Sequence, residues 1–197
     1  MDSRKCPFCS DDEVETLYHW QCACTRFADA RTKVHNDIWS EVFKAICSFV
    51  PEGWASYKET TLGHLLDGSR LTDHAARRPD GIFCQTSTMQ YVLVDFTRGW
   101  GSRPAELLEQ EQTKHNTYST ILNDLQRHHS LEFFPLACGY NGALPVRTWK
   151  ALMDRLGLSS GDQERVLKIA VRAICVGFST MVDIRHGCIS ARKQSSH

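Results

Sequence analysis

Residues 80–96 read DGIFCQTSTMQYVLVDF and contain two short apolar runs, each with an aspartate at one end. The runs 81–84 and 89–96 have the length of buried strands, and the polar residues between them are typical of a hairpin connection. A hairpin places Asp80, at the start of the first strand, beside Asp95, near the end of the second. This stretch therefore predicts a small sheet with two carboxylates at one end.

Segments of helical periodicity surround this hairpin, and we expect helices over 26–50, near 57–66, and over 104–128, 145–157 and 161–186. A further strand is expected over 131–137, where Pro135 indicates an edge position or a break. The last helix is apolar over much of its circumference, so we expect it to be largely buried. Together these elements predict an α/β fold in which helices flank a small mixed sheet.

The composition of the 197 residues is balanced, with 23 Lys and Arg against 23 Asp and Glu. A net charge of zero gives no global argument for nucleic-acid binding, so such a partner has to be inferred from local patches. A hydrophobic content of 42% predicts a packed core. The N-terminus has no signal-peptide pattern, and no apolar run is long enough to cross a membrane, so we expect no membrane partner.

Four cysteine and histidine residues near the N-terminus have the spacing of a zinc site. Cys6, Cys9, His19 and Cys24 are separated by two, nine and four residues. Three thiolates and one imidazole complete the tetrahedral shell of a structural zinc ion, which would supply most of the folding free energy of so short a module. Cys22 is the alternative to Cys24. The remaining cysteines are scattered singly, which favours a reducing compartment.

Asp80 and Asp95 have the chemistry of a divalent-metal site. Apposed carboxylates repel each other unless a cation bridges them, and their oxygens suit Mg²⁺ or Mn²⁺. Lys114 lies on the following helix, with Glu111 and Tyr118 on the same face. A lysine there could orient an attacking water or neutralise transition-state charge. The same residue types also cap turns and occupy solvated helix positions, so the spacing alone leaves a structural role open.

Three segments carry a resemblance to a known family: residues 77–81, residues 92–97, and Lys114 with Tyr118. They resemble the restriction-like endonuclease domain of site-specific non-LTR retrotransposons, a branch of the PD-(D/E)XK nuclease superfamily. In that branch a CCHC zinc knuckle precedes the nuclease, and the N-terminal Cys/His set matches it in type and order. Thr97 departs from the wider superfamily, which has a lysine there. The retrotransposon branch typically carries this lysine on the helix instead.

The resemblance implies roles for individual residues. Asp80 and Asp95 would bind Mg²⁺ or Mn²⁺, Lys114 would be the catalytic lysine, and Tyr118 is a further catalytic candidate. The implied reaction is nicking of double-stranded DNA, which exposes a 3′ hydroxyl that primes reverse transcription of the element's RNA. The implied partners are the DNA target, the element RNA and the reverse transcriptase part of the same polyprotein, and the implied location is the nucleus.

Several arginines are candidate DNA contacts, namely Arg70, Arg77, Arg78 and Arg98, since arginine contacts to phosphates position a duplex. The alternative is an ordinary solvated loop. Trp100 could also touch DNA. Glu59 is interpreted as a surface residue, with a third metal carboxylate as the alternative.

The predicted organisation is a zinc knuckle, a connecting helix, an endonuclease domain and a polar tail, over residues 1–25, 26–52, 53–190 and 191–197. No polymerase motif is present, so we expect the chain to be the C-terminal piece of a larger protein or a remnant of one. Two other functions remain open. One is a catalytically inactive, zinc-stabilised nucleic-acid-binding module with a nuclease-like fold. The other is a protein-interaction domain whose aspartates only cap turns.

Overall fold

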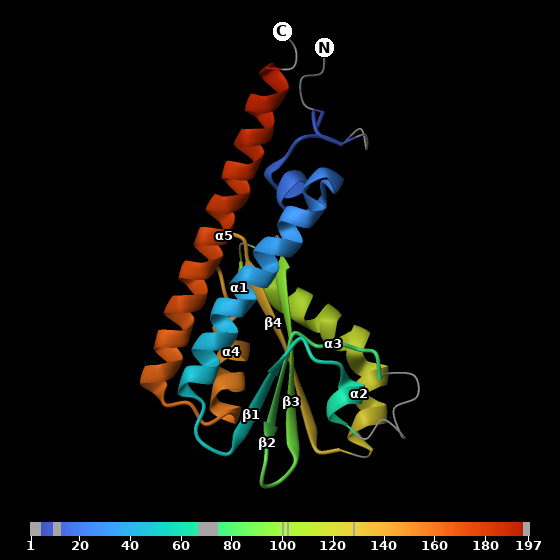
Figure 1. Ribbon diagram of the computed structural model, residues 1–197, viewed down its shortest axis with the longest axis vertical. Coiled ribbons are helices and arrows are strands. Elements are labelled where there is room, and N and C mark those ends of the chain that lie inside the picture. The colour runs from blue at the N-terminus through green and yellow to red at the C-terminus, as the bar shows by residue number, and fades with distance from the viewer. Residues whose placement is uncertain are drawn as a thin grey trace.

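A four-stranded mixed sheet lies at the centre of the computed structural model (Figure 1). The strands follow one another across the sheet in chain order: β1 (Trp54–Lys58), β2 (Gly81–Gln85), β3 (Gln90–Gly99) and β4 (Leu131–Gly139). The first three strands are antiparallel, whereas β4 is parallel to β3. A parallel neighbour needs a crossover connection, which α3 (Pro104–Gln126) supplies. The predicted hairpin and mixed sheet are therefore confirmed.

The structure describes residues 5–9, 13–66, 75–99, 101, 103–127 and 129–194. Helices cover both faces of the sheet: α3 and the short α2 (Leu62–Leu65) on one face, and α1 (Ala28–Phe49), α4 (Val146–Arg155) and α5 (Ser160–Gln194) on the other (Figure 1). Each face of the sheet has its own apolar core, and successive residues of β3 pack alternately into one core and the other. Val92, Val94 and Phe96 pack towards α1. Tyr91 and Leu93 pack towards α3. Because both faces are covered, these strands are apolar on both sides.

One strand and one helix differ from the prediction. The sequence predicts a helix near 57–66, but Trp54–Lys58 forms β1, and only Leu62–Leu65 is helical. This strand is at the sheet edge and is only five residues long, so its pairing with β2 stabilises the extended conformation that Trp54 and Tyr57 favour. At the opposite edge lies β4, which contains Pro135, as predicted.

The long helix α5 is buried along one face only, which corrects the expectation of a largely buried helix. Val166, Ala170 and Ile174 are buried, while Val176 is 58% exposed. At Gly177 an added Cβ atom would lie 2.8 Å from side-chain atoms of Ile38 and Val34, so the missing side chain lets α1 and α5 approach closely. The helix continues to Gln194, into the segment expected to be a polar tail. Within the described ranges, no helix is long and apolar enough to cross a membrane.

The segment expected to be a connecting helix is part of the main core. Trp39 of α1 is almost fully buried and stacks on Phe96 of β3, with ring centroids 5.4 Å apart. Its indole Nε1 donates a hydrogen bond to the backbone carbonyl of Asp80 at 2.8 Å. Helix α1 thereby holds the start of β2 in place.

Glu111 is a buried carboxylate that ties α3 to the rest of the fold. It accepts hydrogen bonds from the Ala137 backbone N–H at 3.1 Å and from the Thr148 hydroxyl at 2.6 Å. Burial raises the pKa of this carboxyl, while the two hydrogen bonds oppose the shift. Although Glu111 is one turn from Lys114, its carboxylate is bound to β4 and α4 and serves packing.

We predict that Glu111→Ala lowers the free energy of unfolding by about 2–3 kcal/mol, because it leaves the Ala137 N–H and the Thr148 hydroxyl without their acceptor. Glu111→Gln keeps an acceptor and should cost less. Urea unfolding followed by circular dichroism measures both, with Glu109→Ala as the exposed control on the same helix. An equal loss in the Glu109 variant would contradict this role.

Candidate functional site

The N-terminal cysteines and histidine come together as predicted. The ligand atoms of Cys6, Cys9, His19 and Cys24 all lie within 4.8 Å of one another. The Sγ atoms of Cys6 and Cys24 are 3.8 Å apart, and the Sγ atom of Cys9 is 3.2 Å from Nε2 of His19. Cys22 is not a member of this group. The cluster can hold a metal ion such as zinc.

Backbone hydrogen bonds set the positions of these four side chains. The Cys6 N–H donates to the carbonyl of Glu13 at 2.8 Å, which fixes the backbone at the first cysteine. The second pair comes from a π-helical turn, η1 (His19–Ala23), followed by the 3₁₀ turn η2 (Thr25–Phe27). The Cys24 N–H donates to the carbonyl of His19 at 2.6 Å. A single helical turn thus brings the last two ligands to the same point.

This N-terminal module, residues 5–27 where described, is docked on the C-terminal half of α5 (Figure 1). Arg185 of α5 forms an ion pair with Glu15 and lies over the ring of Trp20, 5.6 Å from its centroid. Trp20 also packs near Phe178, with ring centroids 6.5 Å apart. These contacts make the module part of the same packed body as the sheet.

The two aspartates of the hairpin meet at one end of the sheet. Gly81 pairs with Val94, so the register continued by one residue sets Asp80 opposite Asp95. The Asp80 carboxylate accepts the Phe96 backbone N–H at 2.6 Å, which holds it at the strand bearing Asp95. Burial raises the pKa of the Asp95 carboxyl. The nearby Lys114 opposes this shift, and the negative charge of Asp80 adds to it.

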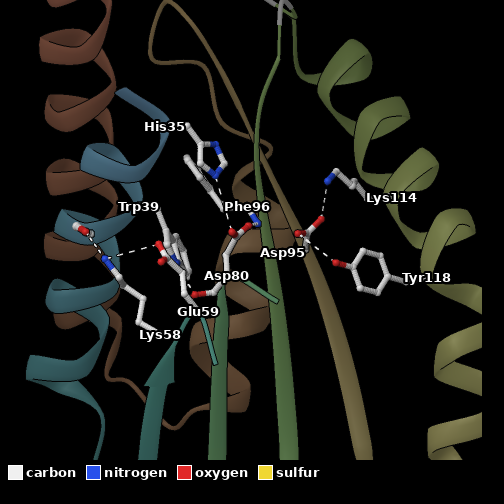
Figure 2. Close-up of polar contacts among 10 residues, drawn as sticks. His35, Trp39, Lys58, Glu59, Asp80, Asp95, Phe96, Lys114 and Tyr118 are labelled. Atoms are coloured by element: carbon white, nitrogen blue, oxygen red, sulfur yellow. Dashed lines mark hydrogen bonds and ion pairs between the residues drawn. The ribbon is translucent and has the colours of Figure 1, made fainter. Parts of the chain in front are cut away.

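Helix α3 presents two predicted site residues to Asp95 (Figure 2). The Lys114 ammonium lies 2.8 Å from Oδ2 of Asp95, and the Tyr118 hydroxyl donates to Oδ1 at 3.5 Å. Successive residues of β3 point to opposite faces of the sheet. Asp95 lies two residues after Leu93 and therefore points to the same face, towards α3. Burial, with the charges of Asp95 and Asp80, raises the pKa of Tyr118 to about 12. Its hydroxyl therefore stays protonated and acts as a donor.

Helix α1 contacts Asp80 from the opposite side through His35, a residue that the sequence analysis did not single out (Figure 2). Nε2 of His35 is 3.8 Å from Oδ1 of Asp80, and its ring packs on Phe96 at 5.3 Å. His35 and Trp39 are one helical turn apart, so both face the end of the hairpin. In the sequence, His35 is a polar residue next to the apolar face of this helix, and only this position could have indicated its contact with Asp80.

The remaining predicted residues have separate positions. Arg77 is exposed, and its charge acts to lower the pKa of Tyr118. Arg78 donates to the backbone carbonyl of Glu59, whose carboxylate is 3.8 Å from Lys58. Arg98 points to the N-terminal module and donates to the carbonyl of Gln21 at 3.3 Å. Arg70 and Trp100 lie outside the described residues.

Among the described residues, the N-terminal group is the one cluster of three or more Cys, His, Asp or Glu side chains close enough to hold a metal ion. Glu59 is not part of such a group. At the end of the hairpin the structure therefore brings together a pair of carboxylates, a lysine and a tyrosine.

We predict that the purified chain binds one zinc ion and that Cys24→Ser abolishes this binding, whereas Cys22→Ser does not. Because the cluster is docked on α5, loss of the metal should lower the melting temperature by about 10 °C. Metal analysis and thermal unfolding, with and without a chelator, measure this. Retained zinc in Cys24→Ser, or its loss in Cys22→Ser, would contradict the assignment.

No family model matches the sequence, and no curated protein matches it either. The function of the chain has to be argued from its own two sites, the Cys/His cluster and the carboxylate pair with its lysine.

Proposed function

We propose that this chain is a divalent-metal-dependent DNA endonuclease with a restriction-endonuclease-like core, and that it nicks double-stranded DNA. The observation that carries this proposal is the convergence of Asp80, Asp95 and Lys114 at one end of the sheet. These residues come from the start of β2, from β3 and from α3. Sequence spacing alone did not require them to meet. The small mixed sheet with helices on both faces is also what such a core needs.

The two aspartates suit a magnesium-type ion. Mg²⁺ usually takes one or two protein carboxylates and fills its other positions with water and substrate phosphate oxygens, so a third acidic residue is not required. The pKa of the Asp95 carboxyl is raised by burial and by Asp80, and a bound cation would relieve both effects. When bound, the ion would polarise the scissile phosphate and activate a water molecule.

Lys114 can supply positive charge beside the reacting phosphate. The Lys114 side chain is 36% exposed, while the Asp95 side chain that it contacts is 8% exposed. Lys114 thus lies at the boundary between the buried carboxylate and the surface, where its ammonium can contact a phosphate oxygen or a water molecule. Charge placed in advance in this way stabilises the negative charge that develops during phosphodiester cleavage.

Tyr118 is a positioning residue in this proposal. Its hydroxyl donates to Asp95, and its ring stacks on Phe133 with centroids 4.7 Å apart. A phenol with a pKa of about 12 stays neutral near pH 8, so it contributes a fixed hydrogen bond and does not exchange protons.

We further infer that the nick primes reverse transcription of a retrotransposon RNA in the nucleus, with the reverse transcriptase part of the same polyprotein as partner. The support for this is the sequence resemblance, together with the Cys/His cluster upstream of the carboxylate pair. Exposed Arg77, close to Tyr118, is a candidate phosphate contact on the path to Asp95.

A catalytically inactive nucleic-acid-binding module is the second candidate. It is favoured by the direct contact of Lys114 with Asp95, because this ion pair stabilises the buried carboxylate without a metal ion. A cleavage assay separates the two candidates.

We predict that the wild-type chain nicks supercoiled plasmid in the presence of Mg²⁺ or Mn²⁺, and that Asp95→Asn and Lys114→Gln each lower the rate by about 100-fold or more. The matched controls are Asp37→Asn and Lys44→Gln, which change exposed residues of α1. Gel electrophoresis of nicked and closed circles measures the rate.

Stability separates a catalytic from a structural role for Asp95. Folding raises the pKa of this carboxyl, so its charged form disfavours the folded state at pH values above that pKa. Asp95→Asn removes this charge and should therefore leave the melting temperature at neutral pH unchanged or higher. Undiminished nicking in Asp95→Asn would refute the site. Duplex binding without any metal-dependent nicking by the wild type would favour the inactive module.

We also predict that Tyr118→Phe lowers the nicking rate by only about twofold to tenfold, because the hydrogen bond that it removes is long and therefore weak, at 3.5 Å. The dependence of the rate on pH between 7 and 10 should keep its shape, because a phenol with a pKa of about 12 does not titrate there. A change in that profile would instead make Tyr118 an acid or base in the reaction.

A further inference from the structure

A cavity of about 270 Å³ lies where the N-terminal module, α1 and β3 meet. Its lining residues come from all three parts and include no carboxylate: Gln21, Cys22, Arg31, Thr32, His35 and Arg98. Two guanidinium groups, an imidazole, a hydroxyl and an amide thus surround one small space. Such a lining has an excess of positive charge and of hydrogen-bond donors.

The two arginines of this cavity have no acidic partner in the described part of the chain, since neither Arg31 nor Arg98 takes part in an ion pair there. Arg31 uses Nη1 to bind the carbonyl of Cys24 at 2.5 Å, and Arg98 uses Nη2 to bind that of Gln21. Nη1 of Arg98 is buried and has no hydrogen-bond partner. Burial lowers the pKa of Arg98, the cysteines Cys138 and Cys22 oppose this shift, and the charge of Arg31 adds to it. A buried charge without a counter-charge is costly, so an anion would be stabilised here.

Gln21 adds a second, independent observation. Its side chain is fully buried, and neither its amide oxygen nor its amide nitrogen has a partner. Buried polar groups in folded proteins are nearly always hydrogen-bonded, and an exception calls for a ligand or a water molecule. Water could satisfy Gln21 alone, but it would leave the two guanidinium charges uncompensated.

We propose that this cavity binds a backbone phosphate of the nucleic acid, next to the phosphate that is cleaved at the carboxylate pair. Guanidinium groups match phosphate oxygens in geometry and charge. His35 lies 3.8 Å from Asp80 (Figure 2). It also lines the cavity, so the same side chain borders both sites. The cavity would hold the strand in register without reading its sequence.

The cavity also gives the Cys/His cluster a role beyond local folding. Gln21 and Cys22 lie between His19 and Cys24, so the metal-binding turn forms one wall of the phosphate site. Arg31 is bonded to the carbonyl of Cys24, which ties the opposite wall to the same turn. This proposal rests on the proposed function only in naming DNA as the molecule that carries the phosphate. The residues of the cavity would bind the phosphate group of any ligand by the same chemistry.

The first test uses inorganic phosphate and the full chain with its metal. Phosphate, compared with chloride at equal ionic strength, should raise the melting temperature of the wild type and of Lys33→Gln, but not that of Arg31→Gln. Lys33 is the matched control, since it is an exposed cation two residues away on α1. An equal rise in Arg31→Gln, or no rise in the wild type, would overturn the phosphate site.

The second test separates DNA from free phosphate as the ligand. In the Asp95→Asn background, the affinity for a duplex is measured against salt concentration. Arg31→Gln should lower the slope of log K against log salt by about 1, while Lys33→Gln should leave it unchanged. An unchanged slope in Arg31→Gln would overturn binding of a backbone phosphate. This test measures binding and not cleavage, so its result does not depend on whether the chain is an active nuclease.

A third measurement needs no variant, in case Arg31→Gln does not fold. The wild type is treated with phenylglyoxal, an arginine reagent, and each site is quantified by mass spectrometry. Phosphate or duplex DNA should reduce modification of Arg31 and Arg98 at least twofold and leave the exposed Arg103 unaffected. Equal modification of Arg31 and Arg98 with and without these ligands would overturn the proposal.

Discussion

The antiparallel register between β2 and β3 is the constraint on which the rest of the structure depends. Pairing of Gly81 with Val94 sets Asp80 opposite Asp95 and decides which face each strand residue takes. A shift of one residue would turn Asp95 away from α3 and bring apolar side chains to the place of the carboxylates. Two apolar cores, one on each face, hold this register, because alternate residues of both strands are buried on opposite sides.

Helix α1 connects the two candidate sites. Trp39 binds the carbonyl of Asp80, and His35 lies beside the carboxylate of the same residue. One turn earlier, Arg31 is bonded to the carbonyl of Cys24 in the metal cluster. The same helix therefore contacts both the cluster and the end of the sheet. In our proposal, this helix aligns a phosphate-binding cavity with the carboxylate pair.

Much of this arrangement could be predicted from local sequence patterns. The helices, the hairpin and the Cys/His cluster follow from periodicity and spacing, which act over a few residues. The strand β1 was missed, because its pairing with β2 depends on residues 23 to 31 positions away. The burial of α5 was overestimated, because one face packs on α1 while Val176 remains exposed. Glu111 was grouped with Lys114 by helical spacing, but its carboxylate binds β4 and α4.

The sequence established which chemical groups this chain carries: four Cys and His side chains that can hold a metal ion, two aspartates bounding a hairpin, and a lysine on the next helix. These depend on residue type and local spacing. Only the tertiary structure decided which groups meet. It joined Lys114 and Tyr118 to Asp95 and His35 to Asp80. It also brought Arg31, Arg98 and Gln21 to the wall of one cavity. Such contacts arise because strand register and helix packing bring together side chains that no local pattern relates.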